Sequence, residues 1–173
     1  MTGRSPLEKL ANSLDRINEI VGNTVRWCAL FMVLLQFAIV VMRYVFGISF
    51  IFLNEGVLYL HSTLFMLGAG YTFLVNGHVR VDIFYAKMQG WSKARIDVFG
   101  HVFFLFPAMI LLLFWSWPTV QLSWSIWEGP ISVGGIPASF LLKSLIPGFC
   151  ILILIQGFSC LLRDLLRAKE AAR

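Results

Sequence analysis

Charged residues are scarce in this sequence of 173 residues: they occupy 13% of positions, about half the share that is usual in soluble domains. Hydrophobic residues make up 58% of the chain, and its mean hydropathy is +0.79. So few charges cannot cover a water-facing surface of normal size. This excludes the soluble globular, disordered and collagen-like classes, and the composition indicates an integral membrane protein.

Cysteine is sparse as well. Cys28, Cys150 and Cys160 all fall inside apolar stretches without CxxC spacing, which argues against a disulfide framework or a thiolate metal site. We find no HExxH helix, hydrolase triad or phosphate-binding glycine loop, so we expect neither an enzyme nor a bound cofactor. Lysine and arginine outnumber acidic residues by 14 to 9, but no basic run alternates with aromatic residues, and we expect no nucleic-acid partner.

Four apolar stretches are long enough to cross a bilayer as helices, which takes about 20 residues. Their hydrophobic runs do not alternate with polar residues as the strands of a membrane barrel would. The sequence therefore predicts an all-α integral membrane protein, with one domain over residues 1–173. The predicted transmembrane helices are Trp27–Phe46, Phe50–Val75, Val98–Trp117 and Phe140–Leu162.

The basic residues predict how these helices are oriented. Twelve lysines and arginines lie in the two terminal tails and in the segment between the second and third spans. Only Arg43 and Lys143 remain for the other side of the membrane. By the positive-inside rule, both termini are expected to be cytoplasmic.

The N-terminal tail has the pattern of a surface helix. Ser5 and Glu8 form a capping box around Pro6, which favours a helix that starts here and covers residues 5–21. Leucine, isoleucine and valine residues then recur at helical spacing at positions 7, 10, 14, 17 and 21. We expect this amphipathic helix to lie on the inner leaflet; the alternative is a helix packed on a soluble partner. Residues 82–88 are a candidate for a second short interfacial helix.

Ionisable groups inside spans are costly and are therefore functional candidates. Arg43 and Glu55 are expected to meet near the outer interface, with Asn54 adding a hydrogen bond. Their position favours an ion pair, or an arginine–phosphate contact, that fixes helix packing. A coupling-ion site is the alternative, but such sites lie at the bilayer midplane.

Two histidines raise the possibility of a haem or quinone site. His61 lies almost halfway along its span, whereas His101 is near the inner end of another. Axial ligands of one haem must lie at similar depth, which disfavours this interpretation.

The segment between the last two spans, residues 120–139, contains no lysine or arginine and is rich in glycine and proline. We expect it to return to the interface and pack on neighbouring helices; docking of an external partner is the alternative. Pro107 and Pro118 are expected to kink and then end the third span.

Four short motifs occur in order from the first span to the third: RYVF at residues 43–46, Asn54-Glu55, LFMLGAGY at residues 64–71 and GHVRVD at residues 77–82. In this order, and with four spans, the chain resembles the small (DctQ-type) membrane subunit of tripartite ATP-independent periplasmic (TRAP) transporters. The HVRVD stretch is the most specific part of the resemblance.

The resemblance implies an accessory subunit in the bacterial inner membrane. Its partners would be a large permease subunit that performs sodium-coupled uptake of an organic acid, a periplasmic receptor acting through the complex, and membrane phospholipids. A haem- or quinone-binding anchor and a self-sufficient small transporter are the alternatives. The candidate residues for subunit packing or lipid anchoring are Arg43, Asn54, Glu55, His78, Arg80 and Asp82. Arg80 would either bind a lipid phosphate or act with Asp82 to fix an inner-leaflet arm.

Overall fold

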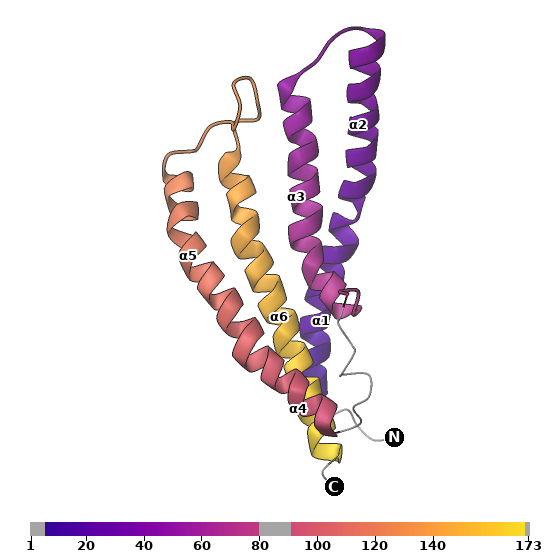
Figure 1. Ribbon diagram of the computed structural model, residues 1–173, viewed down its shortest axis with the longest axis vertical. Helices are drawn as coiled ribbons and strands as arrows, with labels where there is room; N and C mark the ends of the chain where they lie inside the picture. The colour runs from indigo at the N-terminus through magenta and orange to yellow at the C-terminus, as the bar shows by residue number, and fades with distance from the viewer. Residues whose placement is uncertain (1–5, 80–90, 172–173) are drawn as a thin grey trace.

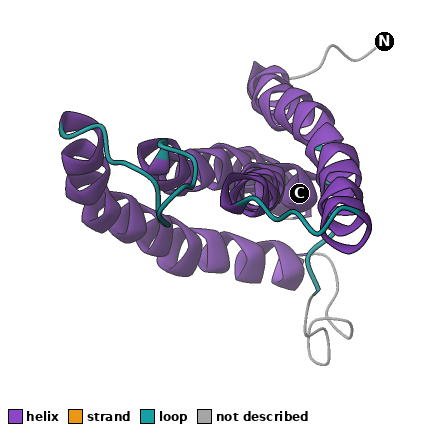
Figure 2. Ribbon diagram, turned by 90° about the horizontal axis from the view of Figure 1, so that it is seen from above, coloured by secondary structure: helices purple, strands orange, loops and turns teal. Residues whose placement is uncertain are grey.

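The computed structural model describes residues 6–79 and 91–171 of the chain. Within these residues all regular structure is helical and no strand is present (Figure 2). Four helical stretches are long and apolar enough to cross a membrane: Pro6–Val45, Ile51–Leu74, Arg95–Ser125 and Ser139–Arg167. The prediction of an all-α fold with four spans is therefore confirmed.

Two junctions between successive helices are very short (Figure 1). A single residue, Arg26, separates the first two, and its N–H group binds the carbonyl of Gly22 at 3.1 Å, so the two helices are nearly continuous. Likewise, the fourth and fifth helices are joined by a π-helical turn. The elements are α1 (Pro6–Val25), α2 (Trp27–Val45), α3 (Ile51–Leu74), α4 (Trp91–Gly100), η2 (His101–Leu105), α5 (Phe106–Ser125) and α6 (Ser139–Ala171).

The end of α3 is set by a left-handed residue. Asn76 has φ of +54°, a conformation that asparagine tolerates better than most residues. The N–H of Asn76 binds the carbonyl of Phe73 at 3.1 Å, and the N–H of Gly77 binds that of Thr72 at 2.8 Å. These two bonds form a Schellman motif, which satisfies carbonyls that the helix end would otherwise leave unpaired.

The third span is longer than expected, because Pro118 does not end it. α5 continues to Ser125, since one missing N–H inside a membrane helix is tolerated when the rest of the hydrogen-bond ladder is intact. The helix ends at Ser125, and the left-handed Trp127, whose φ is +44°, then turns the chain. The segment predicted to be a loop from residue 120 therefore begins at residue 126, and we call residues 126–138 the outer loop.

The start of α1 and the end of α6 lie at the same end of the molecule, which we call the inner end (Figure 1). The outer loop and the α2–α3 connection lie at the opposite, outer end. α6 is the central helix: it contacts α1, α3, α4 and α5, and it contributes most of the buried residues.

α1 does not stand apart from the spans but packs on α3 and α6. It does so through its small and polar residues, since Ala11, Asn18 and Gly22 are buried. A Cβ at Gly22 would lie 2.4 Å from the Tyr71 side chain of α3, so only glycine allows this approach. The bundle covers the apolar stripe predicted from the sequence only in part: Leu14 and Val21 are half-buried, whereas Leu7 and Leu10 are 45% and 46% exposed.

Candidate functional site

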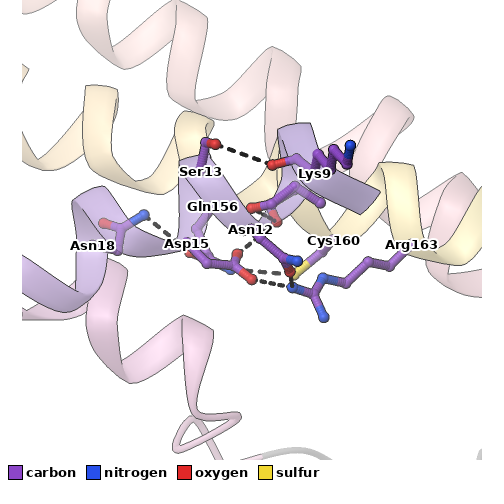
Figure 3. A network of polar contacts seen from close by, with 10 residues as sticks. Lys9, Asn12, Ser13, Asp15, Asn18, Gln156, Cys160 and Arg163 are labelled. Carbon is purple, nitrogen blue, oxygen red and sulfur yellow. Dashed lines mark hydrogen bonds and ion pairs between the residues drawn. The ribbon is translucent and has the colours of Figure 1, made fainter. Parts of the chain in front are cut away.

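A buried polar cluster joins α1 to α6 at the inner end (Figure 3). Asn18 donates to the Gln156 side-chain oxygen at 3.0 Å and to the Leu152 carbonyl at 3.3 Å. Gln156 in turn donates to the Asp15 carboxylate at 3.0 Å. Ser159 donates to the same carboxylate at 2.6 Å. We call Asp15, Asn18, Gln156, Ser159 and Arg163 the inner polar cluster.

Arg163 closes this cluster toward the surface. Its guanidinium forms an ion pair with Asp15 and donates to the Asn12 side-chain oxygen at 2.9 Å. The side chain of Asp15 is only 15% exposed, and a charge this far from water needs a partner. Arg163 on a neighbouring helix supplies the compensating charge. The cluster therefore fastens the first helix to the last.

A second set of charges lies beside it, between η2 and α6. Asp164 is 6% exposed, and its carboxylate lies 3.7 Å from Nδ1 of His101 and 3.4 Å from Nη1 of Arg167. The His101 ring stacks on Phe73 of α3 with a centroid separation of 6.0 Å. His101 thus sits where α3, η2 and α6 meet, and its environment is that of a packing residue.

At the outer end, Glu55 of α3 holds the outer loop. Its carboxylate accepts hydrogen bonds from the N–H groups of Ser132 at 3.0 Å and Ile136 at 2.7 Å. Glu55 is 6% exposed, and a Cβ at Gly135 would lie 2.2 Å from its oxygens. Backbone N–H groups that converge on a buried carboxylate compensate its charge in the way an ion pair otherwise would.

This geometry corrects the expected pairing of Arg43 with Glu55. Within the described residues Glu55 binds backbone groups of the outer loop, and Arg43 is an exposed residue at the end of α2. Asn54 does not support Glu55 either: its amide donates to the Phe50 carbonyl at 3.0 Å. An arginine at this position is free to contact lipid phosphate, the other possibility considered above.

The outer loop is also tied to α6. Lys143 binds the Glu128 carboxylate at 2.5 Å, and Ser123 donates to the same oxygen. The hydrogen bond from Lys143, followed by that from Ser123, lowers the pKa of Glu128 below its ordinary value. Trp124 donates to Ser144 at 2.8 Å, and its ring packs edge-on against Phe140. The loop thus packs on neighbouring helices.

The remaining candidate residues do not converge on one site. His78 is exposed, with its ring 6.2 Å from that of Phe73. Arg80, Asp82 and the proposed short helix at residues 82–88 lie outside the described residues. Among the four candidates that lie in the described residues, Glu55 is the one that accepts hydrogen bonds from another segment of the chain.

The inner polar cluster is not among the sites predicted from the sequence, because Asn18, Gln156 and Ser159 are neutral and do not count as ionisable groups within spans. Gln156 and Ser159 interrupt an apolar run three residues apart and so lie on one face of a helix. That spacing is a recognisable sign of a polar helix contact.

The described side chains give no support to a shared haem iron. His101 stacks on Phe73, which follows His61 by twelve residues in α3. At a rise of 1.5 Å per residue the two histidines are separated by about 18 Å along the helix, too far to bind one iron from opposite faces. Among the described residues, no group of three or more His, Cys, Asp or Glu side chains is placed to hold a metal ion.

Comparison with family models of known proteins finds a match. The family model described as "Tripartite ATP-independent periplasmic transporters, DctQ component" matches residues 32–167, more than three quarters of the chain. The match covers α3, the outer loop and the α6 half of the inner polar cluster, and it begins after α1. No curated protein and no solved structure matches the chain.

Proposed function

The chain belongs to the DctQ family, the small membrane components of TRAP transporters, and we propose that it packs on the large permease subunit and anchors its scaffold. In this proposal the large subunit carries out the sodium-coupled uptake of an organic acid. The small subunit contributes no substrate ligand, and it meets the periplasmic receptor through the complex. Its place is the bacterial inner membrane, with both termini cytoplasmic.

The observation that carries the proposal is that the buried carboxylates bind groups of the same chain. Among the described residues, the buried carboxylates Glu55 and Asp164 and the nearly buried Asp15 all bind groups on another element of the same chain. Contacts of this kind fix helices relative to one another. Such a rigid unit is suited to hold a moving partner in the bilayer.

The outer faces of the helices support the same role. Phe37 on α2 and Phe114 on α5 are 66% and 72% exposed, and large apolar side chains dominate both helices. In a bilayer such faces meet either lipid tails or a partner helix, and both occupants are expected of a subunit that widens the footing of a larger permease.

The proposal is tested by reconstitution. The chain is co-expressed with the large TRAP subunit from the same organism and purified through a tag on the small subunit. The complex is then placed in vesicles with the receptor and a panel of carboxylic acids. We expect the two subunits to co-purify, and uptake to require both of them and an inward sodium gradient. Uptake by vesicles that hold this chain alone would contradict the proposal, as would a large subunit that transports at full rate without it.

A further inference from the structure

An apolar groove of about 450 Å³ lies between the end of α1 and the inner half of α3. Small residues line part of this groove: Gly22 on α1, and Gly68 and Ala69 on α3. Val25, Leu64 and Phe65 supply apolar surface around it. A volume of this size is typical of small-molecule sites.

Among the described residues that line the groove, Arg26 is the charged side chain. His78 and neutral polar side chains line it as well, and no carboxylate is among these described lining residues. Within the part of the chain that the structure describes, Arg26 makes no ion pair; its guanidinium lies 6.0 Å from the centroid of the Trp27 ring. The groove therefore has an apolar interior, and at its edge lies the Arg26 guanidinium, which forms no ion pair with the described residues.

The position of Arg26 matches the depth of lipid headgroups. It directly precedes α2, whose 19 residues span about 28 Å, close to the thickness of the hydrocarbon core. Trp27, beside it, is a residue type enriched at this level of the bilayer. Gly68 faces the same level, since a Cβ there would lie 3.8 Å from Val25.

We propose that this groove binds one anionic phospholipid of the inner leaflet, with an acyl chain between α1 and α3 and the phosphate at Arg26. Charge complementarity favours a lipid over a partner helix, because a helix at this depth would bring apolar side chains and leave the guanidinium unmatched. The proposal depends on the chain lying in a membrane and not on its part in transport.

The test is a titration of the full chain in detergent with dioleoyl phosphatidylglycerol or dioleoyl phosphatidylcholine, followed by native mass spectrometry. The two lipids share their tails and differ in net charge. We expect the wild type to bind phosphatidylglycerol about fivefold more tightly than phosphatidylcholine, the effect of one arginine near a headgroup whose phosphate charge no choline group compensates. Arg26→Gln should remove this preference, whereas the matched control Arg16→Gln, on the exposed surface of α1, should keep it.

A second variant tests the apolar part of the site. Gly68→Leu places a side chain in the groove and should weaken the binding of both lipids. A Cβ at Gly68 makes only ordinary van der Waals contacts, so the backbone can keep its place, and the rest of the leucine side chain fills the space of the acyl chain. A wild type without preference, or an Arg26→Gln chain that keeps the preference, would overturn the proposal. So would loss of the bound lipid when the large subunit is added, because the groove would then belong to a partner helix. Displacement by inorganic phosphate alone would equally count against a lipid.

Discussion

Asn18 on α1 and Gln156 on α6 are both fully buried, and the amide of the first donates to the side-chain oxygen of the second at 3.0 Å. The two residues lie 138 positions apart, so this bond connects the first helix to the last. Around it, Asp15 and Arg163 extend the same contact toward the surface. The relationship explains why α1 belongs to the bundle although its apolar residues Leu7, Leu10 and Ile17 are exposed.

Gln156→Leu should loosen this connection. The change removes the bonds to Asn18 and Asp15 and leaves the buried Asn18 amide with only the Leu152 carbonyl at 3.3 Å. Polar contacts between membrane helices contribute about 1 kcal/mol, and we expect a loss of that order. The measurement is the thermal midpoint of unfolding of the full chain in detergent, with tryptophan fluorescence as the signal.

Gln36→Leu is the matched control, because Gln36 is exposed on α2. Its thermal midpoint should stay near that of the wild type. Equal midpoints for the wild type and Gln156→Leu would show that the inner polar cluster does not hold α1 in place.

Glu55→Gln should release the outer loop. A neutral amide keeps one acceptor oxygen where the carboxylate has two, so the N–H groups of Ser132 and Ile136 cannot both be held as before. We expect faster hydrogen exchange at these two amides, by about tenfold, measured by mass spectrometry. Arg43→Gln distinguishes the two interpretations of Glu55: it should leave this exchange unchanged, whereas an Arg43–Glu55 pair would require it to rise.

Gly135→Ala should lower the thermal stability of the chain more than the addition of one methyl group suggests. The added Cβ would lie 2.2 Å from the Glu55 carboxylate oxygens, so either the loop or the buried carboxylate must move. Overpacking of this kind costs about 1–3 kcal/mol. Gly129→Ala in the same loop meets open space and should behave as the wild type. Indistinguishable thermal midpoints for these two variants would contradict the close packing of the loop on α3.

The four spans could be predicted from the sequence because their length and apolarity alone determine that they cross a membrane. The faces they present to one another could not. In a bilayer an exposed helix face is as apolar as a buried one, so the stripe of Leu7, Leu10 and Ile17 did not show which side of α1 meets the bundle. The more informative residues were Asn18 and Gly22, which are among the residues that α1 buries against the bundle.

The partner of Glu55 was hidden for a related reason. A sequence shows the charged side chains that can compensate a carboxylate, but not the backbone N–H groups that a folded loop brings to it. The outer loop offers these groups only once the left-handed Gly134, with φ of +84°, has turned the chain. Arg43 was therefore the visible candidate, although the contact is made by Ser132 and Ile136.

The contact between Glu128 and Lys143 should make the outer loop sensitive to acid. Because Lys143 lowers the pKa of Glu128 in the folded chain below the ordinary value of 4.5, the contact stabilises the fold above pH 4.5 and is lost as the pH falls through the lower, folded-state pKa. Glu128→Gln removes this dependence. We expect the difference in thermal midpoint between the wild type and Glu128→Gln to be full at pH 7 and to shrink below pH 4.5. A difference that stays constant down to pH 3 would show that the charge of Glu128 does not contribute to holding the loop on α6.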